Sequence, residues 1–200
     1  EPNPKMFTPH LTPLESSKIS DGASSIAILS EEGLKKTGIP ENQAVEIAGY
    51  GHAVGDITKD PENPTSLDTM KAAINKAFES AGITKDDLAT VEIHDCFAIA
   101  AVLGVEALGL ASHGKGADYI LQGNTARDGE IPFNTTGGLI GWGHPTGATG
   151  VHMAVTLWEQ LTGNAEKAQI NIPSDRPYGM SINMGGDDIT VMAIIYKRAE

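Results

Sequence analysis

The sequence predicts a layered α/β domain with a largely buried sheet. Three observations predict it: short apolar runs of strand type alternate with helical stretches, 40% of the 200 residues are apolar, and only 20% are charged. This composition suits a sizeable core and argues against a disordered chain. The length fits one ordinary domain or one large lobe of a bigger enzyme.

The first forty residues predict irregular chain, one strand and one helix. Four prolines make residues 1–14 irregular. The apolar run 24–29 is suited to a buried strand. An acidic pair after residue 30 then opens a helical turn, which Gly38 and Pro40 close.

The remaining chain predicts alternating strands and helices joined by two long loops. Strands are expected at 44–51, 90–93, 179–183 and 189–196, and helices at 67–81, 98–108 and 148–161. The helix at 67–81 has one apolar face and begins at a cap supplied by Ser66 or Asp68. The polar stretch 52–66 is a loop of the kind that often carries function, and the glycine-rich stretch 114–129 is expected to be a flexible excursion. The aspartate pair 187–188 lies at a turn, where it is either solvated or capping.

The charge and the cysteine count exclude several classes of function. Acidic residues outnumber basic ones by 26 to 14, and the formal charge of −12 opposes binding to nucleic acid or to an anionic membrane surface. No apolar stretch is long enough to span a bilayer, and the first thirty residues lack a secretory pattern. The single cysteine excludes an internal disulfide and a multi-cysteine zinc site, and no histidine spacing indicates a metal site. We therefore expect no metal and a reducing, cytoplasmic setting.

A candidate catalytic group follows the strand at 90–93, where His94, Asp95 and Cys96 stand at the junction with a helix. Amide groups at a helix start favour a nearby anion, so a thiol at this place tends toward a lowered pKa, and an adjacent imidazole strengthens the effect. The alternative is structural, because a single cysteine before an apolar helix is often a small buried apolar residue.

Two glycine-rich stretches are further candidates. Six glycines surround His144 and Pro145 within residues 134–150, which suggests a loop wrapped against a ligand or a second loop. A tight turn with a hydrogen-bonded histidine is the alternative. Gly185 and Gly186, between two strands, either form a simple hairpin turn or aim backbone N–H groups at an oxyanion.

Taken in order, these stretches resemble the C-terminal half of a thiolase, from about Lys18 to Arg198. HDCF at 94–97 is similar to the block of the sterol-carrier-protein-type thiolases, where mainstream members of the acetyl-CoA acetyltransferase family carry NEAF. The stretch NTTGGLIGWGHPTGATG resembles the family's GHP block, which is the most specific part of the resemblance. NMGG at 183–186 stands where mainstream thiolases carry the C-x-G motif.

The resemblance implies a thiolase-like layered αβαβα fold built from two similar βαβαβαββ domains. Residues 1–40 would be the end of the N-terminal domain, with a loop, a strand and a helix, and residues 43–198 would be the C-terminal domain. A strand at 24–29 without its sheet neighbours would be an unpaired apolar edge, which is expected to aggregate or to recruit a partner.

The resemblance also implies roles in acyl transfer between CoA thioesters, with no cofactor beyond the CoA substrate. Cys96 would be the acid/base that removes a proton from the acyl-CoA, because a tuned thiol has a pKa near the working pH. His144 would activate the nucleophile and stabilise the thioester oxygen. His94 would complete an oxyanion pocket for the enolate, directly or through water. The further oxyanion-hole and substrate-binding residues would be Phe97, Gly143, Asn183, Gly185 and Gly186.

The nucleophilic cysteine of the family belongs to the N-terminal half, and Cys96 cannot be both nucleophile and acid/base. We therefore expect this chain to need a partner that carries the nucleophile, as a fragment, a cleavage product or one subunit of a split enzyme, in a homo- or hetero-oligomer. Two alternatives stay open. One is a retro-aldolase or condensing subunit beside a small zinc-ribbon partner, and the other is a non-catalytic module that binds CoA thioesters.

Overall fold

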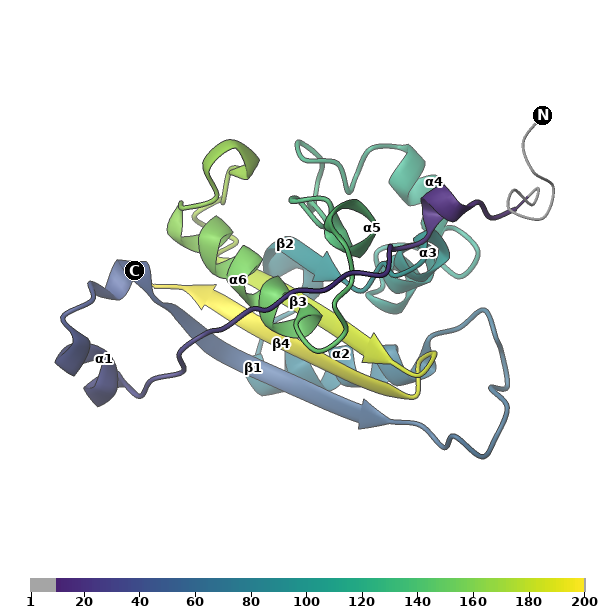
Figure 1. Cartoon of the computed structure of the whole chain (residues 1–200), viewed down its shortest axis with the longest axis horizontal. Helices are drawn as coiled ribbons and strands as arrows, with labels where there is room; N and C mark the ends of the chain where they lie inside the picture. Colours follow the sequence, from purple (N-terminus) through teal and green to yellow (C-terminus); the bar gives the residue numbers. More distant parts are fainter. Residues whose placement is uncertain (1–9, 200) are drawn as a thin grey trace.

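The computed structural model describes residues 10–199, which form one mixed sheet with helices on both faces (Figure 1). The sheet has four strands in the order β1 (Val45–Val54), β4 (Thr190–Arg198), β3 (Tyr178–Gly185) and β2 (Leu88–Ile93). The β1–β4 and β4–β3 pairs are antiparallel, and the β3–β2 pair is parallel. The prediction of an α/β domain with a largely buried sheet is confirmed.

Two long helices cover opposite faces of this sheet. On one face, α2 (Asp68–Ala81) packs with the odd-numbered residues of β4, and on the other face α6 (Thr149–Thr162) packs against Tyr196. Figure 1 shows α6 in front of the sheet and α2 behind it. The apolar face predicted for α2 is the buried one, because Met70, Ala73, Ile74 and Ala77 have almost no exposed area.

The third strand of the implied βαβαβαββ order is reduced to a single contact. Phe133 makes one isolated parallel bridge with Val91, beyond the outer edge of β2. Between β2 and this bridge lie α3 (Ala98–Ala107) and α4 (Gly116–Leu121), and between the bridge and α6 lies the short α5 (Gly138–Trp142). Among residues 10–199, no helix is both long enough and apolar enough to cross a membrane.

The stretch 114–129, expected to be a flexible excursion, contains a short helix and hydrogen-bonded turns. The Gly116 N–H donates to Glu106 Oε1 at 2.8 Å, where α4 begins. The Ile131 N–H donates to the Asn124 carbonyl at 3.0 Å, which closes the turns that follow. Two of the glycines here, Gly114 and Gly123, provide left-handed backbone at the turns.

The cap of α2 comes from the far end of the chain and not from Ser66 or Asp68, as the sequence had suggested. The Asp188 carboxylate accepts the N–H groups of Thr69 and Met70 at 2.9 and 2.8 Å. Asp188 lies in the left-handed turn between β3 and β4, so this acceptor ties the turn to the first turn of α2. One of the two aspartates at 187–188 is therefore a capping residue.

Replacement of Asp188 by alanine is expected to lower the unfolding free energy by about 1 kcal/mol, because two helix N–H groups lose their acceptor. Asp187→Ala is the matched control, since Asp187 has the same left-handed backbone but an exposed side chain. Urea denaturation measures both variants. Equal losses would mean that backbone conformation, and not the cap, determines the effect.

Residues 17–30, called the strap below, do not form the buried strand predicted at 24–29. The strap runs outside the sheet, past α6 and on to α1 (Glu31–Thr37) (Figure 1). A strand needs a hydrogen-bonded neighbour, and the described part of the chain places none beside residues 24–29. As a result Ile26, Ile28 and Leu29 are 45%, 71% and 46% exposed.

The strap is expected to promote association through these side chains. Ile28→Thr should weaken self-association or partner capture about tenfold, because it removes exposed apolar area but keeps the β-branched shape. Ile39→Thr is the control, since Ile39 is 47% exposed but lies beyond α1. Sedimentation velocity over a concentration series measures the association. Identical behaviour of the two variants would contradict a specific role for the strap.

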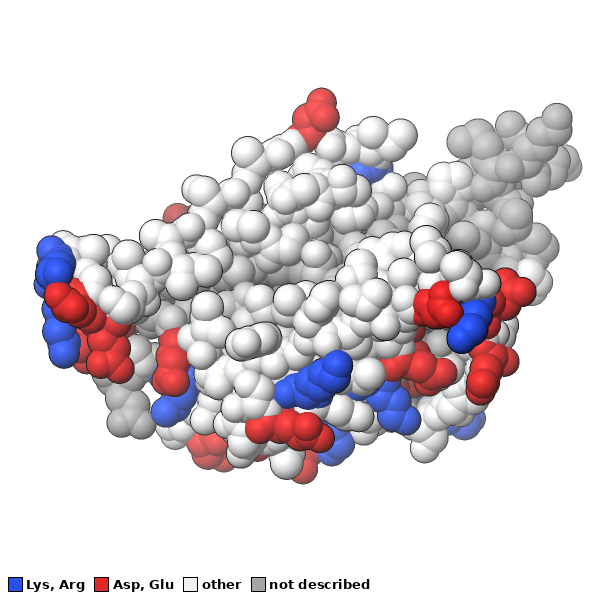
Figure 2. Space-filling model, turned by 90° about the horizontal axis from the view of Figure 1, so that it is seen from below, with Lys and Arg blue, Asp and Glu red and all other residues white. Residues whose placement is uncertain are grey.

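Charges of both signs are mixed on the face shown in Figure 2. Basic side chains on this face lie among acidic ones rather than in a separate patch, for example over α1, where Lys36 pairs with Glu32 at 2.6 Å. This face therefore offers no concentrated positive field to an anionic polymer.

Candidate active site

A cavity of about 760 Å³ opens at the edge of the sheet where β2 and β3 end. It brings together seven of the eight residues that the sequence singled out. These are His94, Cys96, Phe97, His144, Asn183, Gly185 and Gly186. They come from three separate parts of the sequence, so the cavity is a product of the fold. Among residues 10–199 no cluster of metal-ligating side chains is present.

The parallel pairing of β2 and β3 places His94 beside Asn183. Ile93 pairs with Ile182 in the register of the two strands, so the residues that follow them, His94 and Asn183, lie side by side. The His94 Nδ1 and Asn183 Oδ1 atoms are 2.6 Å apart, so the ring donates from Nδ1 and presents Nε2 elsewhere. Asn134 fixes the end of β2, because its side chain bonds both the N–H and the carbonyl of Ile93, at 2.7 and 3.0 Å.

His144 is held by the first residue of α6. Its Nδ1 lies 2.7 Å from Thr149 Oγ1, and that hydroxyl donates to the Pro145 carbonyl at 3.1 Å. Since the hydroxyl proton is already used, the hydroxyl accepts from His144 Nδ1–H, and Nε2 is left with a lone pair. The ring stands edge-to-face to His94 with 4.9 Å between centroids.

Burial keeps both imidazoles neutral near pH 7. Desolvation lowers the pKa of His94, although its bond to Asn183 acts in the opposite direction. Desolvation also lowers the pKa of His144, against the opposing effect of the Asp95 carboxylate. Two neutral rings that each carry a free Nε2 are suited to accept protons or hydrogen bonds.

The Cys96 thiol has the opposite perturbation to the one expected from its place before α3. Burial raises the pKa of Cys96, and the negative charges of Asp95 and Asp187 add to this effect. The Phe97 amide lowers it, as predicted for a helix start, but is outweighed. Cys96 is therefore a protonated thiol before any reaction begins, and it is half-buried at the cavity wall.

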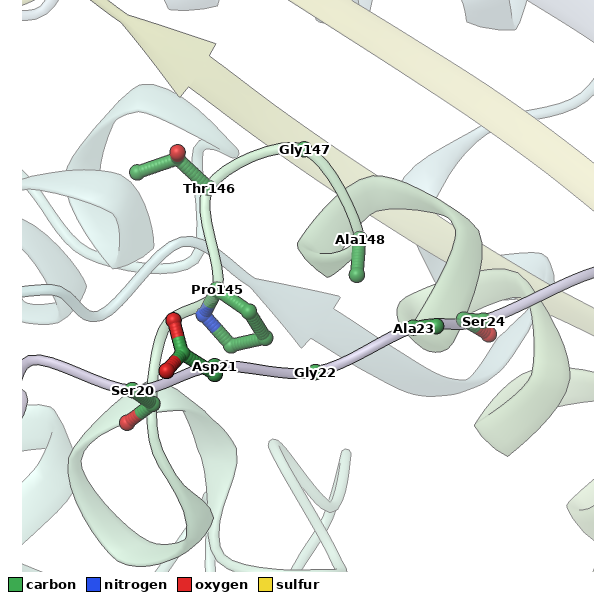
Figure 3. Close-up of a pocket in the computed structure, with 9 residues that line it drawn as sticks. All are labelled: Ser20, Asp21, Gly22, Ala23, Ser24, Pro145, Thr146, Gly147 and Ala148. Atoms are coloured by element: carbon green, nitrogen blue, oxygen red, sulfur yellow. The ribbon is translucent and has the colours of Figure 1, made fainter.

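Gly143 lies outside the cavity and packs closely against the strap instead. Its φ of 116° is a left-handed backbone value that favours glycine, and a Cβ there would collide with the Ser20 side chain of the strap. The strap also passes Pro145, which a Cβ on Gly22 would approach to 2.9 Å. Figure 3 shows this crossing, where a second cavity of about 420 Å³ lies between residues 20–24 and 145–148.

The strap contacts the HDCF segment (residues 94–97) as well as the glycine-rich loop. The Ser17 N–H donates to the Cys96 carbonyl at 2.8 Å, and Ser16, the residue before the strap, forms a β-bridge with Phe97. The strap therefore lies against both sides of the site, at the HDCF junction and at the His144 loop. The prediction that the glycine-rich stretch wraps against a second loop agrees with this contact.

Several residues of the site were not identified from the sequence. Thr149 and Asn134 position the two segments that carry the candidate histidines, and Leu67, Ile99 and Leu103 give the cavity an apolar side. Asn134 and Thr149 both lie in the stretch NTTGGLIGWGHPTGATG, which was the available signal for them. No sequence signal identified the apolar lining, because its residues are far apart in the sequence.

Known proteins resemble this chain over most of its length. The family model described as "Thiolase C-terminal domain-like" matches residues 49–198. An acetyl-CoA acetyltransferase of Methanothermobacter thermautotrophicus is 36% identical over 198 residues, which is 98% of this chain and 50% of that protein. Sterol carrier protein 2 of Oryctolagus cuniculus is 37% identical over 165 residues, which is 80% of this chain and 30% of that protein.

A solved structure shares the fold at lower sequence similarity. The structure titled "Ltp2-ChsH2(DUF35) aldolase" superimposes with a TM-score of 0.65 at 19% identity, covering 75% of this chain and 38% of that one. The chain thus spans half or less of the length of these known proteins.

Proposed function

This chain belongs to the thiolase C-terminal domain-like family, and on that premise we propose that it supplies the acid/base half of an acyl-CoA C-acyltransferase. The observation that supports this most is the meeting of Cys96, His94 and His144 in one cavity. The partner half, on the same gene product or on another chain, would carry the nucleophilic cysteine.

In the proposed condensation, His144 accepts the proton of the nucleophilic thiol at its free Nε2. The sulfur then attacks the thioester carbonyl, and CoA leaves as the thiol with that proton. His144, neutral again, takes the thiol proton of Cys96, and the Cys96 thiolate then takes a proton from the α-carbon of a second acyl-CoA. The resulting carbanion attacks the acyl-enzyme carbonyl. The carbon–sulfur bond to the nucleophile breaks, which gives a 3-oxoacyl-CoA, and the released sulfur takes the proton from His144, which restores the nucleophile as a thiol. Thiolytic cleavage is the same sequence in reverse.

The cavity residues stabilise the charges that form along this path. A protonated His144 donates from Nε2 to the carbonyl oxygen, and the backbone N–H of Gly185 is a second donor. A neutral His94 presents a lone pair at Nε2, so it would act on the enolate oxygen through a water that it orients. Asn183 occupies the place of the C-x-G cysteine and cannot titrate, so proton transfer falls to Cys96.

Cys96→Ala tests this assignment in the enzyme completed with its nucleophile-bearing half. Exchange of the acetyl-CoA α-protons in deuterated water should fall by about 10²–10⁴-fold, the usual contribution of one acid/base group. His113→Ala is the control, since this exposed ring lies outside the cavity. Exchange retained at the wild-type rate in Cys96→Ala would refute the assignment.

A retro-aldolase that works with a second subunit is the alternative that a specific observation favours. The aldolase named above shares this fold. Cleavage of a 3-hydroxyacyl-CoA without added CoA would favour this reaction over thiolysis. Binding of acyl-CoA without turnover, in the presence of any nucleophile-bearing half, would instead indicate a non-catalytic CoA-thioester-binding module.

A further inference from the structure

Glu92 is a buried acidic residue that the proposed reaction does not use. It lies in the middle of β2 with 2% of its surface exposed, and its Oε1 atom has no hydrogen-bond partner among the described residues. It shares a face of β2 with His94, two residues further on. No lysine or arginine of the described chain forms an ion pair with it.

The space around Glu92 is a polar layer between β2 and α6. One stripe of α6 is fully buried, and its Gln160 Nε2 donates to Thr135 Oγ1 at 2.9 Å in the turn beside β2. Two further buried hydroxyls, of Thr136 in this turn and of Thr156 on the same stripe, also lack a partner. The layer thus offers Glu92 neutral polar groups and no compensating positive charge.

Among the described groups near Glu92, the others are uncharged near pH 7, and Asp95 is the neighbour that carries a charge. Across the strand pair stands Ser181, whose hydroxyl bonds to that of Tyr196, and both are uncharged near pH 7. His94 on the same face is neutral, as argued above. Asp95 lies two residues beyond the end of β2, and its charge disfavours a second charge on Glu92.

Asp95 anchors the segment that leads to His144. Its Oδ1 accepts the Leu139 N–H at 2.7 Å, in the first turn of α5. Its other oxygen packs so closely on Gly138 that a Cβ there would collide with it. Since α5 ends at Trp142, two residues before His144, the carboxylate of Asp95 fixes the start of the short segment that carries this histidine.

We propose that Glu92 is a positioning residue of the site: as a neutral carboxylic acid it leaves the single negative charge of the pair on Asp95, which then holds α5 and His144 in place. Two carboxylates in one poorly solvated cluster cannot both ionise without a large cost. Burial raises the pKa of Asp95 as well, but the Leu139 and Ile140 amides and the Asn134 side chain donate to this carboxylate and oppose the effect, so that Asp95 is the member of the pair that keeps the charge. Burial, followed by the charge of Asp95, raises the pKa of Glu92 to about 8.

Carbon-13 NMR of the side-chain carboxyl groups tests the proposal directly on this chain. The Glu92 signal should titrate with a midpoint near pH 8. In Asp95→Asn the midpoint should move to lower pH, because the like charge is gone. A wild-type midpoint in the ordinary glutamate range, or one that Asp95→Asn leaves in place, would overturn the proposal.

Amide exchange at Leu139 tests the positional consequence. After correction for intrinsic exchange, its protection should fall about tenfold between pH 7 and pH 9 in the wild type and stay constant in Glu92→Gln. Glu159→Gln, on an accessible part of α6, should behave as the wild type. Equal loss in Glu92→Gln and the wild type would refute the link to Asp95.

Only the importance given to His144 rests on the proposed function. Neither measurement needs acyl-CoA or a partner, so their failure would leave the proposed reaction untouched. Conversely, wild-type exchange in Cys96→Ala would refute the reaction and leave the Glu92–Asp95 pair as a structural finding.

Discussion

Glu92→Gln is expected to remove a large pH dependence from the stability of this chain. The pKa of Glu92 is raised from 4.5 to about 8 in the folded state. Between these values the folded protein keeps a proton that the unfolded chain loses. The unfolding free energy therefore falls as the pH rises through this window, by about 1.4 kcal/mol per unit and about 5 kcal/mol in total. Above pH 8 this contribution is constant, and glutamine has none.

Urea denaturation at intervals from pH 5 to pH 8.5 measures this effect as the difference between wild type and variant. The difference should grow with pH in favour of Glu92→Gln, because the amide is never required to lose a proton. Glu46→Gln is the control, since Glu46 is exposed on β1. Parallel curves for wild type and Glu92→Gln would show that Glu92 is ionised in the folded state at pH 7.

The fold was largely predictable because most elements carry their own local signals. The period of apolar residues identified α2, and the left-handed glycines Gly38 and Gly82 ended their helices as the sequence indicated. Predictions failed where an element depends on a distant neighbour. Residues 24–29 have the composition of a buried strand, but no strand of the described chain lies beside them. Asp188 caps a helix that begins 120 residues earlier.

The candidate site was predictable as a set of residues but not as an electrostatic environment. Motif order pointed to His94, Cys96 and His144, and the cavity brings them together. The direction of the Cys96 pKa was predicted wrongly, because a helix start is visible in sequence whereas burial and the approach of Asp187 are not. Glu92 gave no signal, since one acidic residue in a strand reads as solvent-exposed until both faces of the sheet are known to be covered.

Gly51→Ala is expected to destabilise the chain by roughly 3 kcal/mol, the upper range for overpacking. Gly51 lies where β1 crosses α2, and a Cβ there would collide with the Ala73 carbonyl and come within 2.6 Å of the Ala77 backbone nitrogen. These are backbone atoms in the middle of a helix, so no side-chain rotation relieves the overlap, and α2 must move away from the sheet. Gly141→Ala is the control, since its Cβ would meet nothing within 4 Å. Thermal denaturation compares the two. A loss for Gly51→Ala no greater than that for Gly141→Ala would mean that α2 can shift at little cost, and that the contact between β1 and α2 does not hold the domain together.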